Sequence, residues 1–206
     1  MKFDAIILAG GRSSRLDGTD KARLRLPGTD RSGTRNGPPG ETMLQRACGA
    51  ANGASRLVVV GPVDPSDLPA DVIVTREDPP YGGPAAAIGA GFAVLGPDPS
   101  PSILILACDM PGAVAALPYL WEAAAVHRGA DGVLARSEDG QPQQLLGIYR
   151  PQALAKAIGA QPDLENLSVR ALISPLDLVG VAVPVASTMD VDTWDDARQL
   201  GIDRED

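Results

Sequence analysis

The sequence predicts an α/β fold in which helices cover the faces of a mostly parallel β-sheet. Seven short apolar runs of strand length recur along the 206 residues. Stretches with helical periodicity lie between several of these runs, and this alternation is typical of parallel sheets. The composition, 44% hydrophobic and 21% charged, provides for one buried core and excludes wholesale disorder.

The expected strands are short, apolar and partly β-branched, and each ends near a turn signal. They are Asp4–Ala9, Leu57–Val60, Val72–Thr75, Ile103–Ala107, Gly132–Ala135, Leu145–Tyr149 and Val181–Val185. The expected helices repeat apolar residues every three or four positions. They are Thr42–Ala51, Pro84–Leu95, Leu117–Arg128, Pro151–Ile158 and Thr193–Leu200.

One polar segment interrupts this pattern. Pro27–Glu41 contains three Pro and four Gly and almost no apolar residue, which predicts a mobile surface loop. Too few residues precede the loop to form a domain of their own. We therefore expect residues 1–206 to form a single domain with a flexible loop near 27–41.

Charge and composition exclude several classes of partner. The formal net charge of −8 opposes binding to nucleic acid or to an anionic membrane, and aromatic residues make up only 3% of the chain. The N-terminal apolar run is far too short to span a bilayer. Cys48 and Cys108 have neither disulfide-framework nor zinc-site spacing, so each is expected to pack as a small apolar residue in a reducing, cytoplasmic environment.

The segment after the first expected strand is a candidate phosphate site. Adjacent Gly10 and Gly11 let backbone N–H groups approach an anion closely, and Arg15 and Lys21 add positive charge around a triphosphate. The segment has neither the P-loop nor the dinucleotide-binding glycine spacing, so it predicts another kind of nucleotide site. The structural alternative is a Gly-Gly turn flanked by two solvated basic residues.

Four motifs in order resemble one family. The run LAGGRSSRLDGTDKA, from Leu8 to Ala22, resembles the signature LAGGxSxRMGxDK of the molybdenum cofactor guanylyltransferase (MobA-like) family, within the GT-A-like nucleotidyltransferases. Glu77-Asp78 followed by Gly82-Gly83-Pro84 is similar to its ED…GPLAG stretch. Ala107-Cys108-Asp109-Met110-Pro111 and Asp190-Val191-Asp192-Thr193 are similar to its CDMP and DVDTPED stretches.

The resemblance implies a three-layer α/β/α, Rossmann-like nucleotidyltransferase that binds an NTP and Mg²⁺. It implies that Leu8, Ala9, Gly10 and Gly11 hold the nucleotide, that Lys21 and Arg15 contact the phosphates, that Asp78 contacts the nucleoside and that Asp109 holds the metal. The sequence departs from the family at Gly61-Pro62, where many members have an Asn that contacts the nucleoside. Gln141-Pro142 stands where His-Pro is frequent, so the acceptor and the nucleobase are defined less sharply than the reaction.

Asp109 is the best candidate for a metal ligand. It follows a buried strand, so its carboxylate is expected at the carboxyl edge of the sheet, facing the same crevice as Gly10 and Lys21. Mg²⁺ is typically held by one or two carboxylates together with substrate phosphates and water. The structural alternative is an Asp that caps the turn before Pro111.

Asp192 is a candidate second metal ligand or acceptor-orienting group. Thr193 and Asp196 have the spacing of a capping box, so part of this acidic cluster is equally expected to start the last helix. The role of Asp190 stays open. His127 falls late in an expected helix, toward solvent, and is assigned no catalytic role.

These observations together predict transfer of GMP from GTP to a molybdopterin-type cofactor, with release of pyrophosphate. Arg15, Lys21 and Asp109 are the expected catalytic residues, and Mg²⁺ is the expected cofactor. A phosphomonoester acceptor is largely ionised at pH 7, so no strong general base is required. The alternatives are transfer from CTP or to another phosphorylated acceptor, and a non-catalytic module that only binds nucleotide. The sequence alone defines no oligomeric state.

Overall fold

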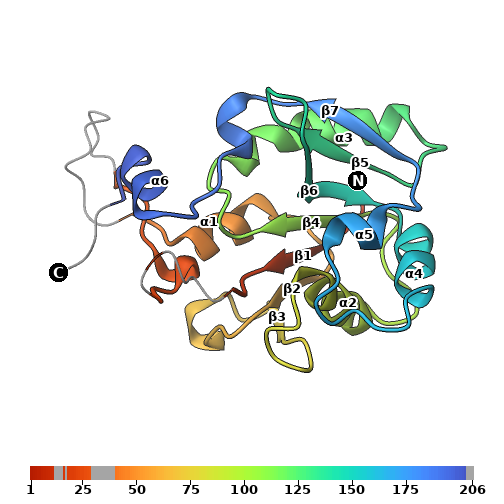
Figure 1. Cartoon of the computed structure of the whole chain (residues 1–206), viewed down its shortest axis with the longest axis horizontal. Helices are drawn as coiled ribbons and strands as arrows, with labels where there is room; N and C mark the ends of the chain where they lie inside the picture. Colours follow the sequence, from red (N-terminus) through yellow and green to blue (C-terminus); the bar gives the residue numbers. More distant parts are fainter. Residues whose placement is uncertain (12–15, 17, 29–39, 203–206) are drawn as a thin grey trace.

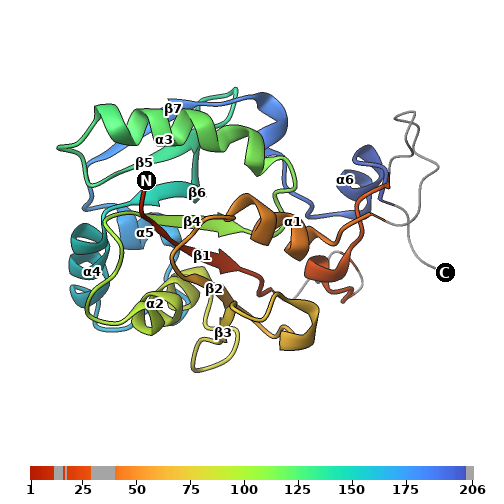
Figure 2. The same cartoon turned by 180° about the vertical axis from the view of Figure 1, so that it is seen from behind.

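The computed structural model describes residues 1–11, 16, 18–28 and 40–202. A seven-stranded sheet in the order β3-β2-β1-β4-β6-β5-β7 lies between two layers of helices (Figures 1 and 2). β1 pairs in parallel with both β2 and β4, β2 pairs in parallel with β3, and β5 pairs in parallel with β7. β6 runs antiparallel to its two neighbours, β4 and β5. The predicted three-layer α/β/α fold with a mostly parallel sheet is confirmed.

The strands and helices follow the apolar runs closely. The strands are β1 (Asp4–Leu8), β2 (Leu57–Val60), β3 (Ile73–Thr75), β4 (Ile103–Ala107), β5 (Gly132–Arg136), β6 (Pro142–Tyr149) and β7 (Leu178–Ala182). The α-helices are α1 (Met43–Ala50), α2 (Pro84–Leu95), α3 (Leu117–Val126), α4 (Pro151–Gly159), α5 (Val169–Ile173) and α6 (Trp194–Gln199). Short 3-10 helices are η2 (Lys21–Arg23), η3 (Pro65–Asp67), η4 (Ala113–Ala116) and η5 (Val185–Thr188). No helix in the described part of the chain is both long and apolar enough to cross a membrane.

Alternating residues of the central strands supply two separate cores. Ala5 and Ile7 of β1 pack with α1 and α3, whereas Ile6 and Leu8 pack with α2, α4 and α5. This alternation follows from the two-residue period of a strand. Gly91 lets α2 pack closely on β1, because a Cβ there would lie 2.6 Å from Ile6 Cγ2.

Three features of the fold differ from the sequence predictions. β7 begins and ends three residues earlier than Val181–Val185, because that range includes Pro184, which cannot donate a ladder hydrogen bond. β6 begins at Pro142, only five residues after β5, and so short a connection permits an antiparallel hairpin but no crossover. The helix α5 was not predicted, although the Ser168 side chain caps it by accepting from the Ala171 N–H.

The predicted loop near 27–41 lies mostly outside the described residues. Its two ends are held together, since the Leu26 N–H donates to Glu41 O (3.0 Å) and the Gly40 N–H donates to Leu26 O (3.1 Å). Leu26, at one end of the segment, therefore lies beside Gly40 and Glu41 at its other end, just before α1.

The strand order places a binding site at the carboxyl ends of β1 and β4. From β1 the chain builds β2 and β3 on one side, and it then crosses through α2 to β4 on the other side of β1. Ligands of open α/β sheets bind outside the carboxyl ends of the strands where the order reverses in this way. The segments after β1 and β4 therefore meet at one crevice.

A buried ion pair fixes the opposite end of β1. The Asp4 carboxylate is fully buried and accepts from Arg56 Nη2 (2.6 Å), from the Ser100 N–H (2.7 Å) and from Ser100 Oγ (3.0 Å). Arg56 also donates to Leu95 O (2.6 Å) at the end of α2. Burial raises the pKa of Asp4, but the hydrogen bonds from Arg56 and Ser100 outweigh it and hold the pKa below its ordinary value. One carboxylate thus joins β1, β2 and the connection from α2 to β4.

Replacing Asp4 by alanine is expected to lower the free energy of unfolding by about 1–3 kcal/mol, because it leaves the buried Ser100 N–H without its acceptor and removes the ion-pair partner of Arg56. Since the folded pKa is depressed, the contribution is present above the unfolded pKa and is lost as pH falls through the folded value, below 3.8. Urea titrations of wild type and Asp4→Ala at pH 7 and pH 3 measure this. A difference between the two proteins that is as large at pH 3 as at pH 7 contradicts the account.

Candidate active site

A cavity of about 1120 Å³ opens at the carboxyl ends of β1 and β4. Its walls come from four parts of the fold: the β1–η2 segment, the segments after β2 and β3 with the start of α2, the segment after β4, and isolated residues of later elements. The lining residues are Leu8, Ala9, Gly10, Gly11, Gly18, Asp20, Lys21, Ala22, Pro62, Glu77, Tyr81, Gly83, Pro84, Ala87, Ala107, Cys108, Asp109, Leu145, Asn166 and Asp192. The cavity is therefore large enough for a nucleotide together with part of a second substrate.

The segment predicted to hold the nucleotide lines this cavity. Leu8 and Ala9 are buried at its base, whereas Gly10 and Gly11 are exposed. The backbone of Gly61, just after β2, packs directly against this turn, because a Cβ at Gly61 would lie 2.6 Å from Ala9 O. Glycine at 61 thus allows two strand ends to meet closely beneath the exposed Gly10–Gly11 backbone. Arg15 lies outside the described residues, so its predicted phosphate contact remains a prediction.

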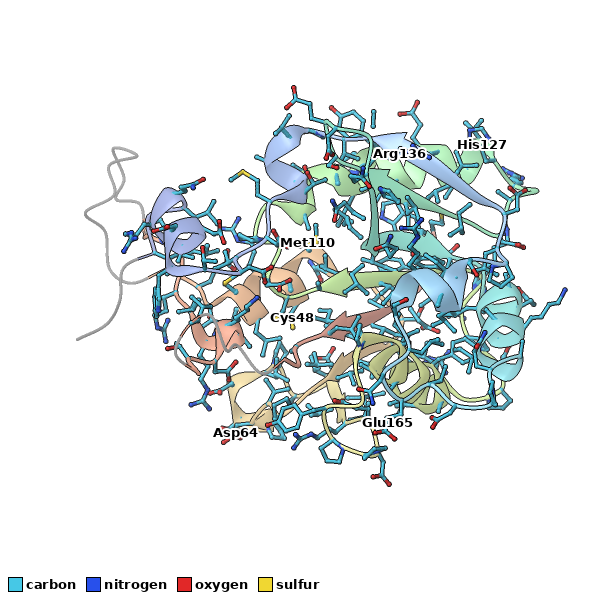
Figure 3. All side chains as sticks on the ribbon, viewed as in Figure 1. Cys48, Asp64, Met110, His127, Arg136 and Glu165 are labelled. Carbon is cyan, nitrogen blue, oxygen red and sulfur yellow. The ribbon has the colours of Figure 1, made fainter. Side chains whose placement is uncertain are left out.

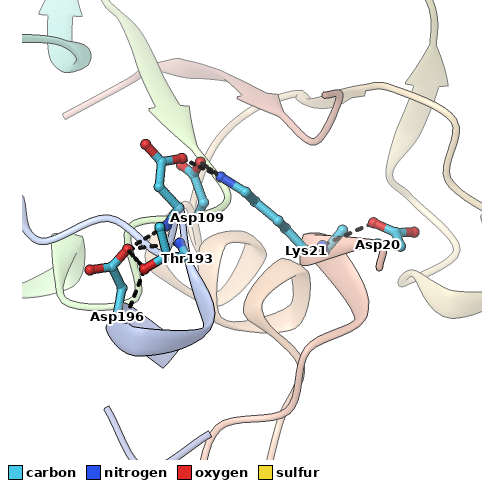
Figure 4. A network of polar contacts seen from close by, with 7 residues as sticks. Asp20, Lys21, Asp109, Thr193 and Asp196 are labelled. Atoms are coloured by element: carbon cyan, nitrogen blue, oxygen red, sulfur yellow. Dashed lines mark hydrogen bonds and ion pairs between the residues drawn. The ribbon is translucent and has the colours of Figure 1, made fainter. Parts of the chain in front are cut away.

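Lys21 joins the two candidate metal carboxylates. Its Nζ lies 2.5 Å from Asp192 Oδ1 and 3.3 Å from Asp109 Oδ2, and all three side chains line the cavity. Figure 4 shows the Lys21 side chain crossing from the β1 side toward Asp109. Burial lowers the pKa of Lys21, but the hydrogen bond and the charges of the two aspartates outweigh it and raise the pKa above its ordinary value. The ammonium therefore stays charged throughout the neutral pH range.

Local backbone interactions position each of these groups. The Asp20 side chain caps η2 by accepting from the Ala22 N–H (3.0 Å), which fixes the turn that carries Lys21. Asp109 follows β4, and its carbonyl accepts from the Val191 N–H (2.9 Å). That bond brings the segment carrying Asp192 beside β4, although the two residues are far apart in the sequence.

The predicted capping box at the start of α6 is confirmed. The Thr193 side chain accepts from the Asp196 N–H, and Asp196 Oδ2 accepts from the Thr193 N–H (2.7 Å). The same carboxylate oxygen also accepts from the Asp192 N–H (3.2 Å). Asp196 thus has a structural role, while Asp192, held by it, lines the cavity.

Replacing Thr193 by alanine is expected to lower the free energy of unfolding by about 1 kcal/mol through loss of this cap. It should also weaken divalent-ion binding with nucleotide, because the Asp196 carboxylate that accepts from the Asp192 N–H loses its hydrogen bond from Thr193 Oγ1 (2.7 Å). Thr42→Ala removes the equivalent cap from α1, away from the cavity, and serves as the matched control for stability and metal titrations. Equal effects of the two variants on metal binding would contradict the positioning role of the cap.

The other predicted residues take different positions. Asp78 is exposed and is not among the residues lining the cavity, whereas the preceding residue, Glu77, lines it. Asp190 is exposed as a residue and does not appear among the cavity-lining residues. Partial burial of its carboxyl, together with the negative charges of Asp192 and Asp109, raises the pKa of Asp190. The predicted contact between Asp78 and a nucleoside therefore stays a prediction.

The predicted packing of the two cysteines and the predicted solvent exposure of His127 are confirmed. Cys48 and Cys108 are both buried free thiols, and burial raises the pKa of Cys48 to about 11. Burial also raises the pKa of Cys108, which packs beneath Asp109. His127 is exposed at the end of α3, and Figure 3 shows it far from Met110, the neighbour of Asp109.

The carboxylates fit a metal ion that arrives with a phosphate ligand. No group of three or more His, Cys, Asp or Glu side chains in the described ranges is arranged to hold a metal ion. However, Asp109 and Asp192 converge on one cation, the Lys21 ammonium. Two carboxylates completed by phosphate oxygens and water are a typical environment of Mg²⁺.

Three cavity residues were not predicted as site residues, although Glu77 lies in the stretch that resembles the family's ED…GPLAG motif. Tyr81 and Asn166 have positive φ values of 64° and 56°, and Glu77 is buried with one carboxylate oxygen unpaired among the described residues. The local sequences Pro-Tyr-Gly and Asn-Leu do not by themselves predict a positive φ at Tyr81 or Asn166. The Gly-Gly pair after Tyr81 is the one local signal of a tight turn.

The α/β/α fold, with an exposed Gly10–Gly11 turn after β1 and paired carboxylates around a lysine, is that of a nucleotidyltransferase, and comparison with known proteins agrees. Residues 5–179 match the model of the MobA-like NTP transferase domain. A relative from Chloroflexus aggregans, named "Probable molybdenum cofactor guanylyltransferase", is 37% identical over 160 residues, which cover 75% of this chain and 69% of the relative. The chain belongs to the MobA-like NTP transferase family.

Solved structures share the fold. The molybdopterin-guanine dinucleotide biosynthesis protein A of Archaeoglobus fulgidus superposes with a TM-score of 0.68 at 18% identity, covering 96% of each chain. A Mycobacterium tuberculosis H37Rv protein solved in complex with manganese superposes with a TM-score of 0.65 at 20% identity, covering 97% of this chain and 98% of the other. These likenesses establish the arrangement of the sheet and helices.

Proposed function

We propose that this protein transfers GMP from GTP to a molybdopterin-type cofactor and releases pyrophosphate. The observation that carries the proposal is the convergence of Lys21, Asp109 and Asp192 in a cavity beside the exposed Gly10–Gly11 turn. The relative named as a probable molybdenum cofactor guanylyltransferase supports the choice of nucleotide and acceptor.

Each residue has a defined task in this proposal. The Gly10 and Gly11 N–H groups and the Lys21 ammonium bind the triphosphate, with Arg15 beside them. Asp109 and Asp192 would hold a divalent ion, Mg²⁺ in our proposal, which would neutralise phosphate charge when bound. With both aspartates holding that ion, Lys21 would be free to contact phosphate oxygens.

The reaction needs alignment and charge stabilisation more than proton transfer. A phosphate oxygen of the acceptor, already ionised at neutral pH, forms a bond to the α-phosphorus of GTP. The bond from the α-phosphorus to the bridging oxygen breaks, and pyrophosphate leaves with that electron pair. Lys21 stabilises the charge that develops on the phosphates. No described histidine lines the cavity, which is consistent with this mechanism.

A product analysis tests the proposal. The purified protein is incubated with Mg²⁺, with each of the four NTPs in turn, and with molybdenum-loaded molybdopterin, and products are identified by mass. We expect the guanine dinucleotide and pyrophosphate. A dominant cytosine dinucleotide would assign CTP instead, and transfer only to a different phosphorylated acceptor, such as a phospholactate, would replace molybdopterin. The cytoplasmic location inferred from the two thiols also stays a prediction.

A further inference from the structure

Tyr81 presents an aromatic side chain at the cavity, and its backbone adopts an unfavourable φ there. Tyr81 is the one aromatic residue among the described residues that line the cavity, and its exposed fraction is 46%. Aromatic residues make up only 3% of the chain. The Tyr81 φ of 64° lies in the left-handed region, which is unfavourable for a bulky residue with a Cβ. Backbone strain of this kind persists only where surrounding interactions enforce it, and it concentrates at functional sites.

The two non-glycine residues with positive φ in the described part of the chain are neighbours at this cavity. Asn166 has a φ of 56°, and its N–H donates to the carbonyl of Gly82, the residue after Tyr81 (2.6 Å). Both Tyr81 and Asn166 line the cavity wall. The turn is therefore held from outside by the segment that precedes α5.

Glu77 holds the turn from within. It is only 8% exposed, and its Oε1 accepts from the Tyr81 N–H (2.9 Å). Its Oε2 is buried with no hydrogen-bond partner among the described residues, so the bond to Tyr81 comes with a desolvation cost. The guanidinium of Arg76 lies 4.9 Å from the centre of the Tyr81 ring and restrains the ring itself.

The position of Tyr81 identifies what it would contact. Tyr81 follows β3, on the half of the sheet that also carries β2, and the cavity-lining apolar residues Pro62, Pro84 and Ala87 belong to the segment after β2 and to α2, which begins just after Tyr81. Lys21 and the two aspartates define the phosphate end. A planar base attached to a triphosphate at that end would extend over this apolar wall.

We propose that Tyr81 stacks on the purine of the bound nucleotide and that Glu77 is the positioning residue that holds Tyr81 in place. The inference rests on the proposed function for the location of the triphosphate. Base–aromatic stacking is stronger for the larger purine ring system, so Tyr81 favours GTP and ATP over the pyrimidine nucleotides. Distinguishing guanine from adenine requires other contacts.

Binding measurements with and without a base test the inference. Calorimetric titrations with Mg²⁺ compare GTP, CTP and inorganic tripolyphosphate, which has no base. Tyr81→Ala is expected to weaken GTP binding roughly 10- to 100-fold, CTP binding less, and tripolyphosphate binding not at all. Tyr81→Phe should retain near-normal GTP binding. The exposed Glu122 of α3 provides a control in Glu122→Gln.

Variants of Glu77 separate positioning from charge. Glu77→Gln keeps an acceptor for the Tyr81 N–H and should bind GTP nearly normally, whereas Glu77→Ala should weaken GTP binding but not tripolyphosphate binding. Unchanged GTP binding in Tyr81→Ala, equal losses for GTP and tripolyphosphate, or a loss confined to the KM for molybdopterin would overturn the inference. If wild type binds GTP in this manner but transfers no GMP, the proposed function fails while the stacking role stands.

Discussion

Replacing Asp109 by asparagine is expected to lower kcat about 10³-fold while leaving the fold intact. The carboxylate lines the cavity and is one of two that converge on a single cation, so the amide removes a charged ligand at the reacting phosphates. The backbone of Asp109, which accepts from the Val191 N–H, is unchanged by the substitution. The loss should therefore appear in turnover and not in the unfolding transition.

Pyrophosphate release at saturating GTP, Mg²⁺ and acceptor measures this effect. Glu122→Gln removes one negative charge from the exposed surface of α3 and controls for the change in net charge. If Asp109→Asn releases pyrophosphate at more than a tenth of the wild-type rate, the assignment of Asp109 as a metal ligand is wrong.

Replacing Lys21 by methionine is expected to lower kcat/KM by 10²- to 10³-fold. The same substitution is expected to strengthen the binding of a divalent metal ion. In the ligand-free protein the Lys21 ammonium contacts both Asp109 and Asp192, so it competes with a divalent cation for the same oxygens. Removing the ammonium takes a competing positive charge away from both carboxylates, and Mn²⁺ should then bind the nucleotide-free protein about tenfold more tightly.

Two titrations of the same variant separate these effects. Mn²⁺ binding is followed by the loss of free-ion electron paramagnetic resonance signal, and activity is followed by pyrophosphate release. Weaker Mn²⁺ binding in Lys21→Met would show that Lys21 supports the metal site instead of competing with it. Because the pKa of Lys21 is raised above its ordinary value, wild-type activity should show no loss due to deprotonation of Lys21 between pH 7 and pH 10.

The elements that the sequence predicts well are those with local signals. β1, β2 and β4 appear as continuous apolar runs because both of their faces are buried. The edge strand β7 has only partly buried residues, so its apolar pattern does not define its ends. The antiparallel direction of β6 follows from its short connection to β5, and the predicted strand Leu145–Tyr149 does not show how short that connection is because it omits Pro142–Gln144.

The residues of the candidate site also divide into those that a local sequence signal predicts and those that it does not. Gly10 and Asp109 closely follow β1 and β4, so their place at the carboxyl edge of the sheet follows from the fold class, and Lys21 belongs to the segment that β1 leads into. Asp192 comes to the site through the hydrogen bond between Asp109 O and the Val191 N–H, which no local pattern encodes. Tyr81 matters through its backbone conformation and its contact with Glu77, and neither can be deduced from residue type alone.

Calorimetric titration of GTP with and without Mg²⁺, in wild type and in Asp109→Asn, tests the central claim most directly. If a triphosphate and a divalent ion are bound together between the Gly10–Gly11 turn and Asp109, Mg²⁺ should strengthen GTP binding to wild type at least tenfold and have little effect on the variant. GTP binding to wild type that does not depend on Mg²⁺, or an equal effect of Mg²⁺ on both proteins, would contradict it.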